Sequence, residues 1–246
     1  MKVIAVYNIK GGVGKTATSV NLAAVSAFEG NKTLIIDLDP QAATSFYFKA
    51  DDEKNQKKNK GWFLKDDVND SIIETEFYNL DILPADKDIR NLEQVFKKLK
   101  KSDSWFKGLV KPVGKMYDVI ILDCQPGISL LSDTIFKNAD VIVVPVIPTV
   151  LSLRTYEQLV EYFKEKDFKK SKLKPFFSMV EKRKKMHIES LRDFSRSHKE
   201  CLNIIIPYNA DVEKMGIHRE PVVRFAPSSE SAKAYFKLWK QVKKAG

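Results

Sequence analysis

The feature that most constrains this chain lies at its start, where an apolar segment at residues 2–8 runs into the glycine-rich stretch KGGVGKT at 10–16. A segment with helical spacing follows at once, over residues 16–28. Glycines allow backbone N–H groups to converge on an anion without interference from a Cβ atom, and the N-terminus of a helix adds the positive end of its dipole. This succession therefore predicts an α/β fold with a phosphate-binding loop.

Short runs rich in Val and Ile recur along the chain and alternate with segments of helical spacing. The runs occupy residues 2–8, 33–37, 80–83, 118–123, 140–146, 175–180 and 201–206, and the helical segments include 16–28, 88–100, 151–163 and 187–197. Continuous apolar strands that alternate with helices are typical of a mostly parallel, twisted sheet with helices on both faces. Ligands bind beyond the carboxyl ends of such strands, so the chemistry is expected there.

A single domain is expected over residues 1–246, because this length is enough to bury one substantial core. The charged segment at 49–61 lacks apolar periodicity and is predicted to form a surface loop, and a helix is predicted over 228–244. No apolar run approaches the roughly 20 residues that a membrane-spanning helix needs. Two cysteines, Cys124 and Cys201, are too few for a disulfide framework, which favours a reducing cytoplasm.

Within the glycine-rich stretch, Lys15 and Thr16 stand where a phosphate-binding loop places its lysine and its hydroxyl. Lys15 would reach the β- and γ-phosphates of a nucleotide, and the Thr16 hydroxyl would bind Mg²⁺. The usual pattern G-x-x-x-x-G-K-[ST] is not met, because Ile9 occupies the first glycine position. The stretch also contains a second lysine, Lys10, for which the ordinary motif has no role.

Acidic residues follow two of the predicted strands at their carboxyl ends. Asp37 and Asp39 flank Leu38 after the strand at 33–37, and Asp123 ends the strand at 118–123. Such carboxylates can bind Mg²⁺ through water or orient the water that attacks a γ-phosphate. In isolation they would be interpreted as solvated turn residues or caps, but the phosphate-binding loop nearby favours the catalytic interpretation.

Three motifs in this order resemble those of the ParA/MinD family of deviant Walker A ATPases, and within it the ParA-type partition proteins. The stretch KGGVGKT matches the family's deviant loop, and DLDPQAATS at 37–45 resembles its second motif, DLDPQGNATS. The stretch YDVIILDCQPG at 117–127 matches the third motif except that Gln125 replaces the first proline. The resemblance extends through the tail at 205–242 and so covers nearly the whole chain.

The resemblance implies a P-loop NTPase domain that acts as an ATP-dependent switch. Two protomers would sandwich two ATP molecules, with Lys10 reaching the partner's nucleotide. It implies catalytic roles for Lys10, Lys15 and Asp39, of which Asp39 orients water, and a Mg²⁺ site formed by Thr16, Asp39 and Asp123. The implied nucleotide-binding residues are Lys10, Gly11, Gly12, Val13, Gly14, Lys15, Thr16, Ala17 and, near the adenine, Pro207.

Family members hydrolyse ATP slowly, bind DNA non-specifically as ATP dimers, and are released when a ParB-like or adaptor protein stimulates hydrolysis. The formal net charge of +10 favours such a polyanionic partner. Basic residues gather in one stretch, and one further arginine near the C-terminus is a candidate because Tyr208 replaces the arginine of the family's IPRN sequence. The predicted DNA-binding residues are Lys182, Arg183, Lys184, Lys185, Arg192, Arg196 and Arg219.

Two functions remain open at this stage. The first is a ParA-type ATPase that positions a plasmid, a chromosome region or a protein cargo on the nucleoid. The second is a MinD-like regulator on the membrane, because Tyr235, Leu238 and Trp239 line one face of a lysine-rich C-terminal helix. Such an apolar stripe more often packs on the protein's own domain. An iron–sulfur reductase of the wider class is disfavoured, since the two cysteines offer too few cluster ligands.

Overall fold

A computed structural model describes residues 1–246 except 54, 56–59, 66–67, 92–95, 97–101 and 246. Within the described residues the sheet has eight strands in the order β3-β4-β2-β5-β1-β6-β7-β8, and every neighbouring pair is parallel except β3 and β4. The strands are β1 (Lys2–Val6), β2 (Thr33–Asp37), β3 (Ile73–Glu74), β4 (Leu80–Leu83), β5 (Val119–Asp123), β6 (Val141–Val146), β7 (Leu173–Val180) and β8 (Ile205–Pro207). The predicted fold class is confirmed.

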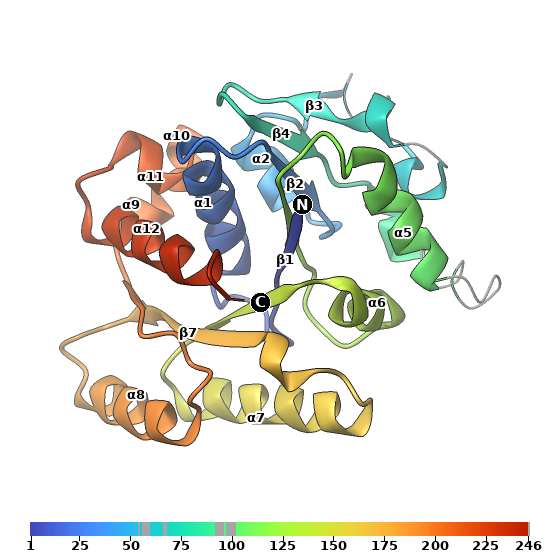
Figure 1. The fold of residues 1–246 in the computed structure, drawn as a ribbon. Helices are drawn as coiled ribbons and strands as arrows, with labels where there is room; N and C mark the ends of the chain where they lie inside the picture. The colour runs from blue at the N-terminus through green and yellow to red at the C-terminus, as the bar shows by residue number, and fades with distance from the viewer. Residues whose placement is uncertain (54, 56–59, 66–67, 92–95, 97–101, 246) are drawn as a thin grey trace.

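Helices cover both faces of the sheet (Figure 1). One face carries α1, α11 and α12, and the other carries α5, α6, α7 and α8. The helices are α1 (Lys15–Phe28), α2 (Ala43–Tyr47), α5 (Ser102–Val113), α6 (Leu130–Asn138), α7 (Val150–Glu165), α8 (Lys185–Ser197), α9 (Ala210–Glu213), α10 (Met215–His218), α11 (Val222–Phe225) and α12 (Glu230–Val242). Short 3-10 turns lie at Trp62–Leu64, Asn69–Ser71, Lys87–Asn91 and Lys170–Lys172.

The central strands are apolar throughout because they are buried on both faces. Along β1, Val3 and Ala5 face one layer of helices, whereas Ile4 and Val6 face the other. This alternation follows from the two-residue period of a strand. Residues of β5 at the carboxyl end lie in register with those of β2, so that Asp123 stands beside Asp37. Polar residues after the strands therefore meet at one edge of the sheet.

Two predicted elements differ from the structure. The strand predicted at 201–206 is limited to Ile205–Pro207, because β7 and β8 pair irregularly and Ile204 N–H instead closes a tight turn on the Leu202 carbonyl at 2.7 Å. The helix predicted at 88–100 begins as a 3-10 turn, and residues 92–95 and 97–100 lie outside the described part. A helix that was not predicted, α5, follows at Ser102–Val113 and buries Phe106 and Leu109.

The predicted charged loop at 49–61 is described at 49–53, 55, 60 and 61. There Lys49 pairs with Glu76 at 2.9 Å, and Ala50 is buried. Residues 54 and 56–59 lie outside the described part of the chain. The predicted C-terminal helix corresponds to α12.

The C-terminal helix α12 packs its apolar stripe against α1 and the sheet. Its buried residues are Ser231, Ala232, Ala234, Tyr235, Leu238, Trp239 and Val242. The Lys2 ammonium donates to the carbonyls of Val242 and Lys243 at 3.2 and 2.9 Å, which closes the end of the helix against β1. The apolar face is core, so this helix exposes no apolar stripe to a bilayer. Among the described residues no helix is both long and apolar enough to cross a membrane.

Candidate nucleotide-binding site

The glycine-rich loop joins β1 to α1 and depends on glycine at two positions. Gly12 and Gly14 have φ angles of 71° and 88°, in the left-handed region that residues with a Cβ atom rarely adopt. A Cβ atom on Gly14 would also lie 2.9 Å from Ser178 Oγ. Gly14 is the N-cap of α1. Because glycine has no side chain, the N–H groups of the first turn receive no hydrogen bond from the cap residue. They form a site that suits an anion.

Asn8 fixes the start of the loop, a role that the sequence analysis did not predict. Its side-chain amide donates to the Pro145 carbonyl at 2.8 Å, and its Oδ1 atom accepts the Lys10 N–H at 2.9 Å. Asn8 is 1% exposed, so these bonds satisfy a buried amide. The signal for this role in the sequence was a single polar residue, Asn8, at the end of an apolar strand.

Lys15 lies beneath the loop with its ammonium directed back at the loop backbone. The side chain is buried, and Nζ donates to the Lys10 carbonyl at 3.0 Å. Burial lowers the pKa of Lys15, and the negative charge of Asp123 opposes this shift. A bound phosphate would stabilise this buried ammonium, which lies at the start of a helix with a carboxylate behind it.

Lys10 differs from Lys15 because it is exposed to solvent. The residue is exposed at the tip of the loop, although its backbone is held by Asn8. Among the described residues, the hydrogen bonds of Lys10 are made by its backbone, to Asn8 and Lys15. The two lysines of the loop therefore face different surroundings, one internal and one external.

The other predicted loop residues surround this lysine pair. Gly11 is exposed, Val13 is buried in contact with the domain, and Thr16 and Ala17 are half-buried in the first turn of α1. These positions place the backbone of 11–17 around the open end of the helix.

Asp123 is a buried carboxylate at the end of β5, behind the first turn of α1. Its oxygens accept the hydroxyls of Ser19 and Thr44 at 2.9 and 2.7 Å, and Thr16 also bonds to it. Burial raises the pKa of Asp123, and these hydroxyls oppose the shift because they stabilise the charged form. The sequence did not predict Ser19 and Thr44 as its partners.

The site has the donor chemistry of a magnesium position. Thr16 and Asp123 offer hard oxygen atoms, and the full burial of Asp123 suits contact with the ion through water. Within the part of the chain that the structure describes, no three acidic, His or Cys side chains form a metal cage. That arrangement fits Mg²⁺, which is commonly held by few protein ligands, by substrate phosphates and by water.

The two aspartates after β2 have different surroundings. Asp37 is fully buried and accepts hydrogen bonds from the Ser45 N–H at 2.9 Å, the Ser45 hydroxyl at 2.7 Å and the Asp39 N–H at 3.2 Å. Burial, followed by the charge of Asp123, raises the pKa of Asp37 to about 7. Asp37 therefore holds the segment 39–45 in place.

Asp39 is only half-buried, and its charge acts on both Lys15 and Asp123. One carboxylate oxygen accepts the Gln41 N–H at 3.0 Å, which orients the side chain in the turn after β2. Of the two aspartates, Asp39 is thus the one on the open side of the site. The structure brings Lys15, Asp39 and Asp123 together at the carboxyl ends of three adjacent strands.

Pro207 ends β8, which is separated by β6 and β7 from the strand β1 that leads into the loop. It pairs in register with Val180 of β7, and the neighbouring residues Ser178 and Met179 are those that a Cβ atom on Gly14 would meet. The carboxyl ends of β7 and β8 therefore flank the start of α1. A role for Pro207 near an adenine stays a prediction.

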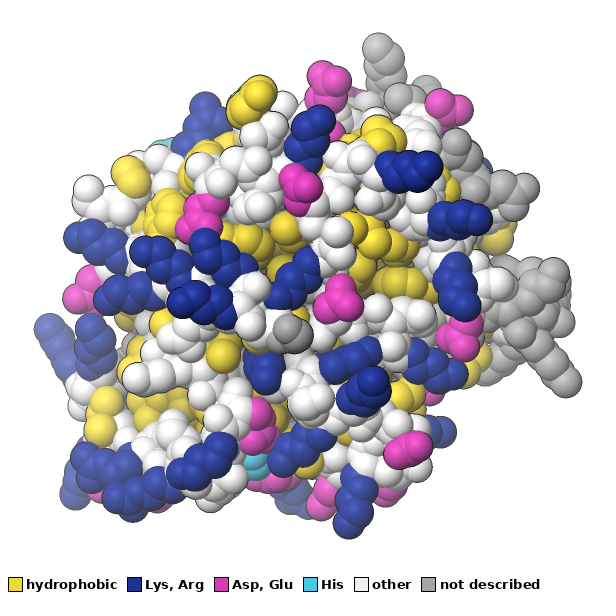
Figure 2. Space-filling view, in the orientation of Figure 1, with side chains coloured by type: hydrophobic (Ala, Val, Ile, Leu, Met, Phe, Trp, Pro, Cys, Tyr) yellow, Lys and Arg dark blue, Asp and Glu magenta, His cyan; other side chains and the backbone are white. Residues whose placement is uncertain are grey.

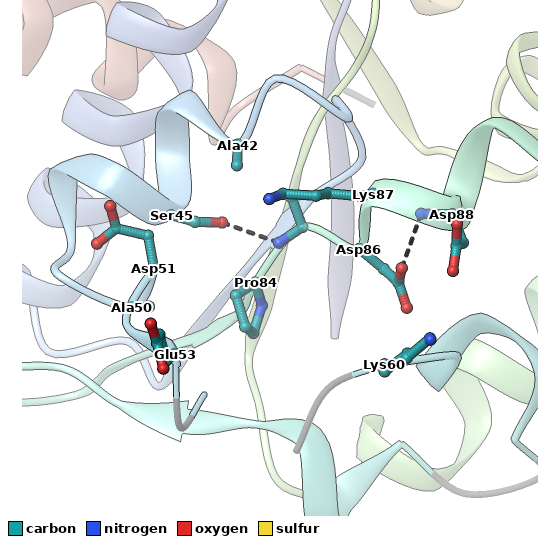
Figure 3. Close-up of a pocket in the computed structure, with 11 residues that line it drawn as sticks. Ala42, Ser45, Ala50, Asp51, Glu53, Lys60, Pro84, Asp86, Lys87 and Asp88 are labelled. Atoms are coloured by element: carbon teal, nitrogen blue, oxygen red, sulfur yellow. Dashed lines mark hydrogen bonds between the residues drawn. The ribbon is translucent and has the colours of Figure 1, made fainter. Parts of the chain in front are cut away.

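A cavity of about 580 Å³ lies beside α2 (Figure 3). One hydrogen bond in its wall joins the Ser45 hydroxyl to the Ala85 N–H at 2.8 Å. Its lining residues are Ala42, Ser45, Ala50, Asp51, Glu53, Lys60, Pro84, Ala85, Asp86, Lys87 and Asp88. Residues 10–17 are not among them, so this cavity is separate from the phosphate-binding loop.

Six of the predicted DNA-binding residues lie together in and before α8. Four of them form ion pairs with nearby acids: Lys182 with Glu230, Lys184 with Glu181, Lys185 with Glu189 and Arg196 with Asp193. Among the described residues, no ion pair is found for Arg183 or Arg192. The stretch 181–199 contains seven basic and three acidic residues, so an excess of positive charge remains.

Arg219 lies apart from this cluster. Its guanidinium forms an ion pair with Asp51, and its Nε atom donates to the Phe46 carbonyl at 2.9 Å. The structure thus places Arg219 against the end of α2 rather than on the basic surface of α8. A DNA contact of Arg219 stays a prediction.

Comparisons with known proteins agree with this geometry. Residues 1–176 match a protein family described as an AAA domain. The chain is 31% identical to the sporulation initiation inhibitor protein Soj of Bacillus subtilis over 251 residues, which covers 98% of each chain. It is 26% identical to the chromosome partitioning protein ParA of Myxococcus xanthus over 260 residues, which covers 99% of this chain and 88% of the relative.

Two solved structures share the fold. The cell division ATPase MinD of Pyrococcus furiosus superimposes with a TM-score of 0.77 at 23% identity, over 100% of this chain and 99% of that chain. A plasmid partition protein of Borrelia burgdorferi, described as putative and bound to AMPPNP, superimposes with a TM-score of 0.80 at 22% identity, over 99% and 97% of the two chains.

Proposed function

This chain belongs to the ParA/MinD group of P-loop ATPases, and from that membership we propose that it is a ParA-type switch that dimerises on ATP, binds DNA non-specifically and positions a cargo. It hydrolyses ATP and uses Mg²⁺. The cargo would be a plasmid, a chromosome region or a protein assembly on the nucleoid. Hydrolysis would be slow until a ParB-like or adaptor protein stimulates it.

The observation that carries the proposal is the meeting of Lys15, Asp39 and Asp123 below the open end of α1. Lys15 and the N–H groups of the loop would bind the phosphates. Thr16, together with Asp39 and Asp123 acting through water, would hold Mg²⁺, which neutralises charge on the phosphates when bound. Asp39 would orient the attacking water, since its carboxylate lies on the open side of the site.

Lys10 supports the dimeric part of the proposal, because it is exposed beside a loop whose own phosphate position is served by Lys15. We expect Lys10→Ala to bind ATP as the wild-type protein does but to form no ATP-dependent dimer. Light scattering after size-exclusion chromatography measures the formation of the dimer. Both proteins would also carry Asp39→Ala, so that the bound ATP is not hydrolysed during the measurement. An ATP-dependent dimer of the Lys10→Ala protein would contradict the role across the interface.

Two lysine- and arginine-rich regions support the DNA part of the proposal. Figure 2 shows basic side chains gathered over α12 and over α8 on the same face of the molecule. The ion pair of Lys182 with Glu230 at 3.1 Å connects the segment before α8 to the start of α12. The exposed lysines of α12 are Lys233, Lys237 and Lys240, and the exposed Lys243 and Lys244 follow directly after the helix. A surface of this kind suits the phosphate backbone, without sequence preference.

Charge reversal on α8 tests the DNA contact. We expect Arg192→Glu with Arg196→Glu to weaken ATP-dependent binding to duplex DNA of arbitrary sequence. Because each phosphate contact contributes about 0.9 to the salt slope, the slope should fall by about 2. Fluorescence anisotropy over a range of salt concentrations measures both quantities.

The matched control is Lys107→Glu with Lys111→Glu on α5, which changes the net charge equally at two exposed positions of a different helix on the same face of the sheet. Equal weakening by both pairs would show a general charge effect and not a contact by α8. Retention of the wild-type protein on anionic vesicles but not on DNA would favour the MinD-like alternative.

A further inference from the structure

Helix α2 carries residues of the nucleotide site although it is only five residues long, Ala43–Tyr47. A helix of this length is not stable by itself in water. Its N-cap residue, Ala42, has a φ angle of 56° and provides no side-chain cap. The position of α2 therefore depends on contacts with the rest of the protein.

The first half of α2 is fixed by the two buried aspartates of the site. Thr44 donates to Asp123 at 2.7 Å, and Ser45 donates to Asp37 through both its N–H and its hydroxyl. These bonds link α2 to the carboxyl ends of β2 and β5. At the carboxyl end of α2, Tyr47 and Phe48 pack against the core, and the polar contacts include those of Arg219.

Arg219 makes the contacts at that carboxyl end. Its Nε atom donates to the Phe46 carbonyl at 2.9 Å, and its guanidinium lies 4.4 Å from the centre of the Phe46 ring. The same guanidinium pairs with Asp51, which lies just beyond α2 and is drawn in Figure 3. A cation at the carboxyl end of a helix is favourable, and so is its stacking on an aromatic ring.

The backbone of Arg219 is in an unfavourable conformation for an arginine. Its φ and ψ angles are 51° and 46°, in the left-handed region where glycine has no steric penalty. Glycine would make this turn after α10 more easily but would provide no side chain for α2. Several contacts hold Arg219 in this unfavourable conformation, which indicates that its side chain has a function.

We infer that Arg219 is a positioning residue for ATP hydrolysis, which acts by clamping the carboxyl end of α2. The segment that Arg219 holds begins with Asp39 and includes Thr44. Loss of the Arg219 side chain would therefore let both residues move relative to Asp123. ATP binding would persist, because Lys15 and the loop are anchored independently through β1 and α1. The inference rests on the ATPase activity and does not depend on DNA binding.

The test uses Arg219→Gly, which removes the clamp and relieves the backbone strain, so that the fold is not penalised. We expect kcat to fall about tenfold, because small misplacements of catalytic groups have effects of this size or larger. The Kd for ATP and the melting temperature should stay at the wild-type values. Arg219→Lys should recover part of kcat, since it keeps the charge but not the planar stacking.

Arg224→Ala is the matched control. Arg224 also stacks on a phenylalanine, Phe77 at 4.6 Å, and pairs with Glu220 at 3.6 Å, and both of these partners lie outside α2. Its loss should leave kcat unchanged. A second check combines Arg219→Ala with Asp51→Asn, and the double variant should lose no more activity than Arg219→Ala alone.

Wild-type kcat in Arg219→Gly would overturn the inference. Loss of ATP affinity and melting temperature in parallel with kcat would also overturn it, since that pattern indicates a general structural role. Both outcomes would leave the proposed function intact. A wild-type protein that does not hydrolyse ATP would instead overturn the proposed function, and this inference with it.

Discussion

Replacement of Lys15 by alanine is expected to weaken ATP binding by about 100-fold or more, equivalent to roughly 3 kcal/mol. The Lys15 ammonium is buried beneath the loop and is the basic group that the fold directs at the phosphate position. Alanine would leave the loop intact but would remove the charge that offsets the triphosphate. Titration with a fluorescent ATP analogue measures the loss.

Lys10→Ala is the control for this experiment, because it removes a lysine from the same loop without removing the internal ammonium. It should bind ATP as the wild-type protein does. If Lys15→Ala retained wild-type ATP affinity, the phosphate-binding role of the loop would be wrong. If both variants lost affinity equally, the division of roles between the two lysines would be wrong.

Asp39→Ala should lower kcat for ATP hydrolysis by about 100- to 1,000-fold, the range expected when a group that orients or deprotonates water is lost. ATP binding and ATP-dependent dimerisation should persist, because the loop and Lys15 are untouched. Continuous measurement of phosphate release gives kcat, and equilibrium binding gives Kd. The variant would then accumulate as the ATP-bound dimer.

The control for this variant is Asp70→Ala, which removes an exposed carboxylate outside the site. Its kcat should equal that of the wild-type protein. Failure of Asp39→Ala to dimerise with ATP would contradict the assignment of Asp39 to the hydrolytic step. An unchanged kcat would show that another group orients the water.

The sequence predicted those features that depend on local patterns. Runs of Val and Ile specify buried strands, and the glycines with Lys15 and Thr16 specify the loop, because each signal lies within a few residues. Helix α5 escaped prediction although its apolar residues have helical spacing, because Gly108 and Pro112 within it are poor helix formers. The strand at 201–206 was predicted too long because apolar composition does not reveal where pairing with β7 begins.

Contacts between residues that lie far apart in the sequence could not be predicted from such local patterns. The different surroundings of Asp37 and Asp39 arise because Ser45 folds back onto Asp37, and nothing in the spacing of the two aspartates reveals this. Arg219 appeared to be one more basic residue for DNA. Its contact with Phe46 joins positions 173 residues apart, which only the fold brings together.

The packing of α12 has a consequence for how the protein is made. Helix α1, which opens at the phosphate-binding loop, leaves the ribosome well before α12. Glu29, just after α1, accepts from the Trp239 indole at 3.0 Å and from the Lys243 ammonium at 2.5 Å. The helix that carries Lys15 therefore obtains its cover only after α12 has been synthesised, so that a nascent chain that still lacks α12 cannot hold a finished nucleotide site.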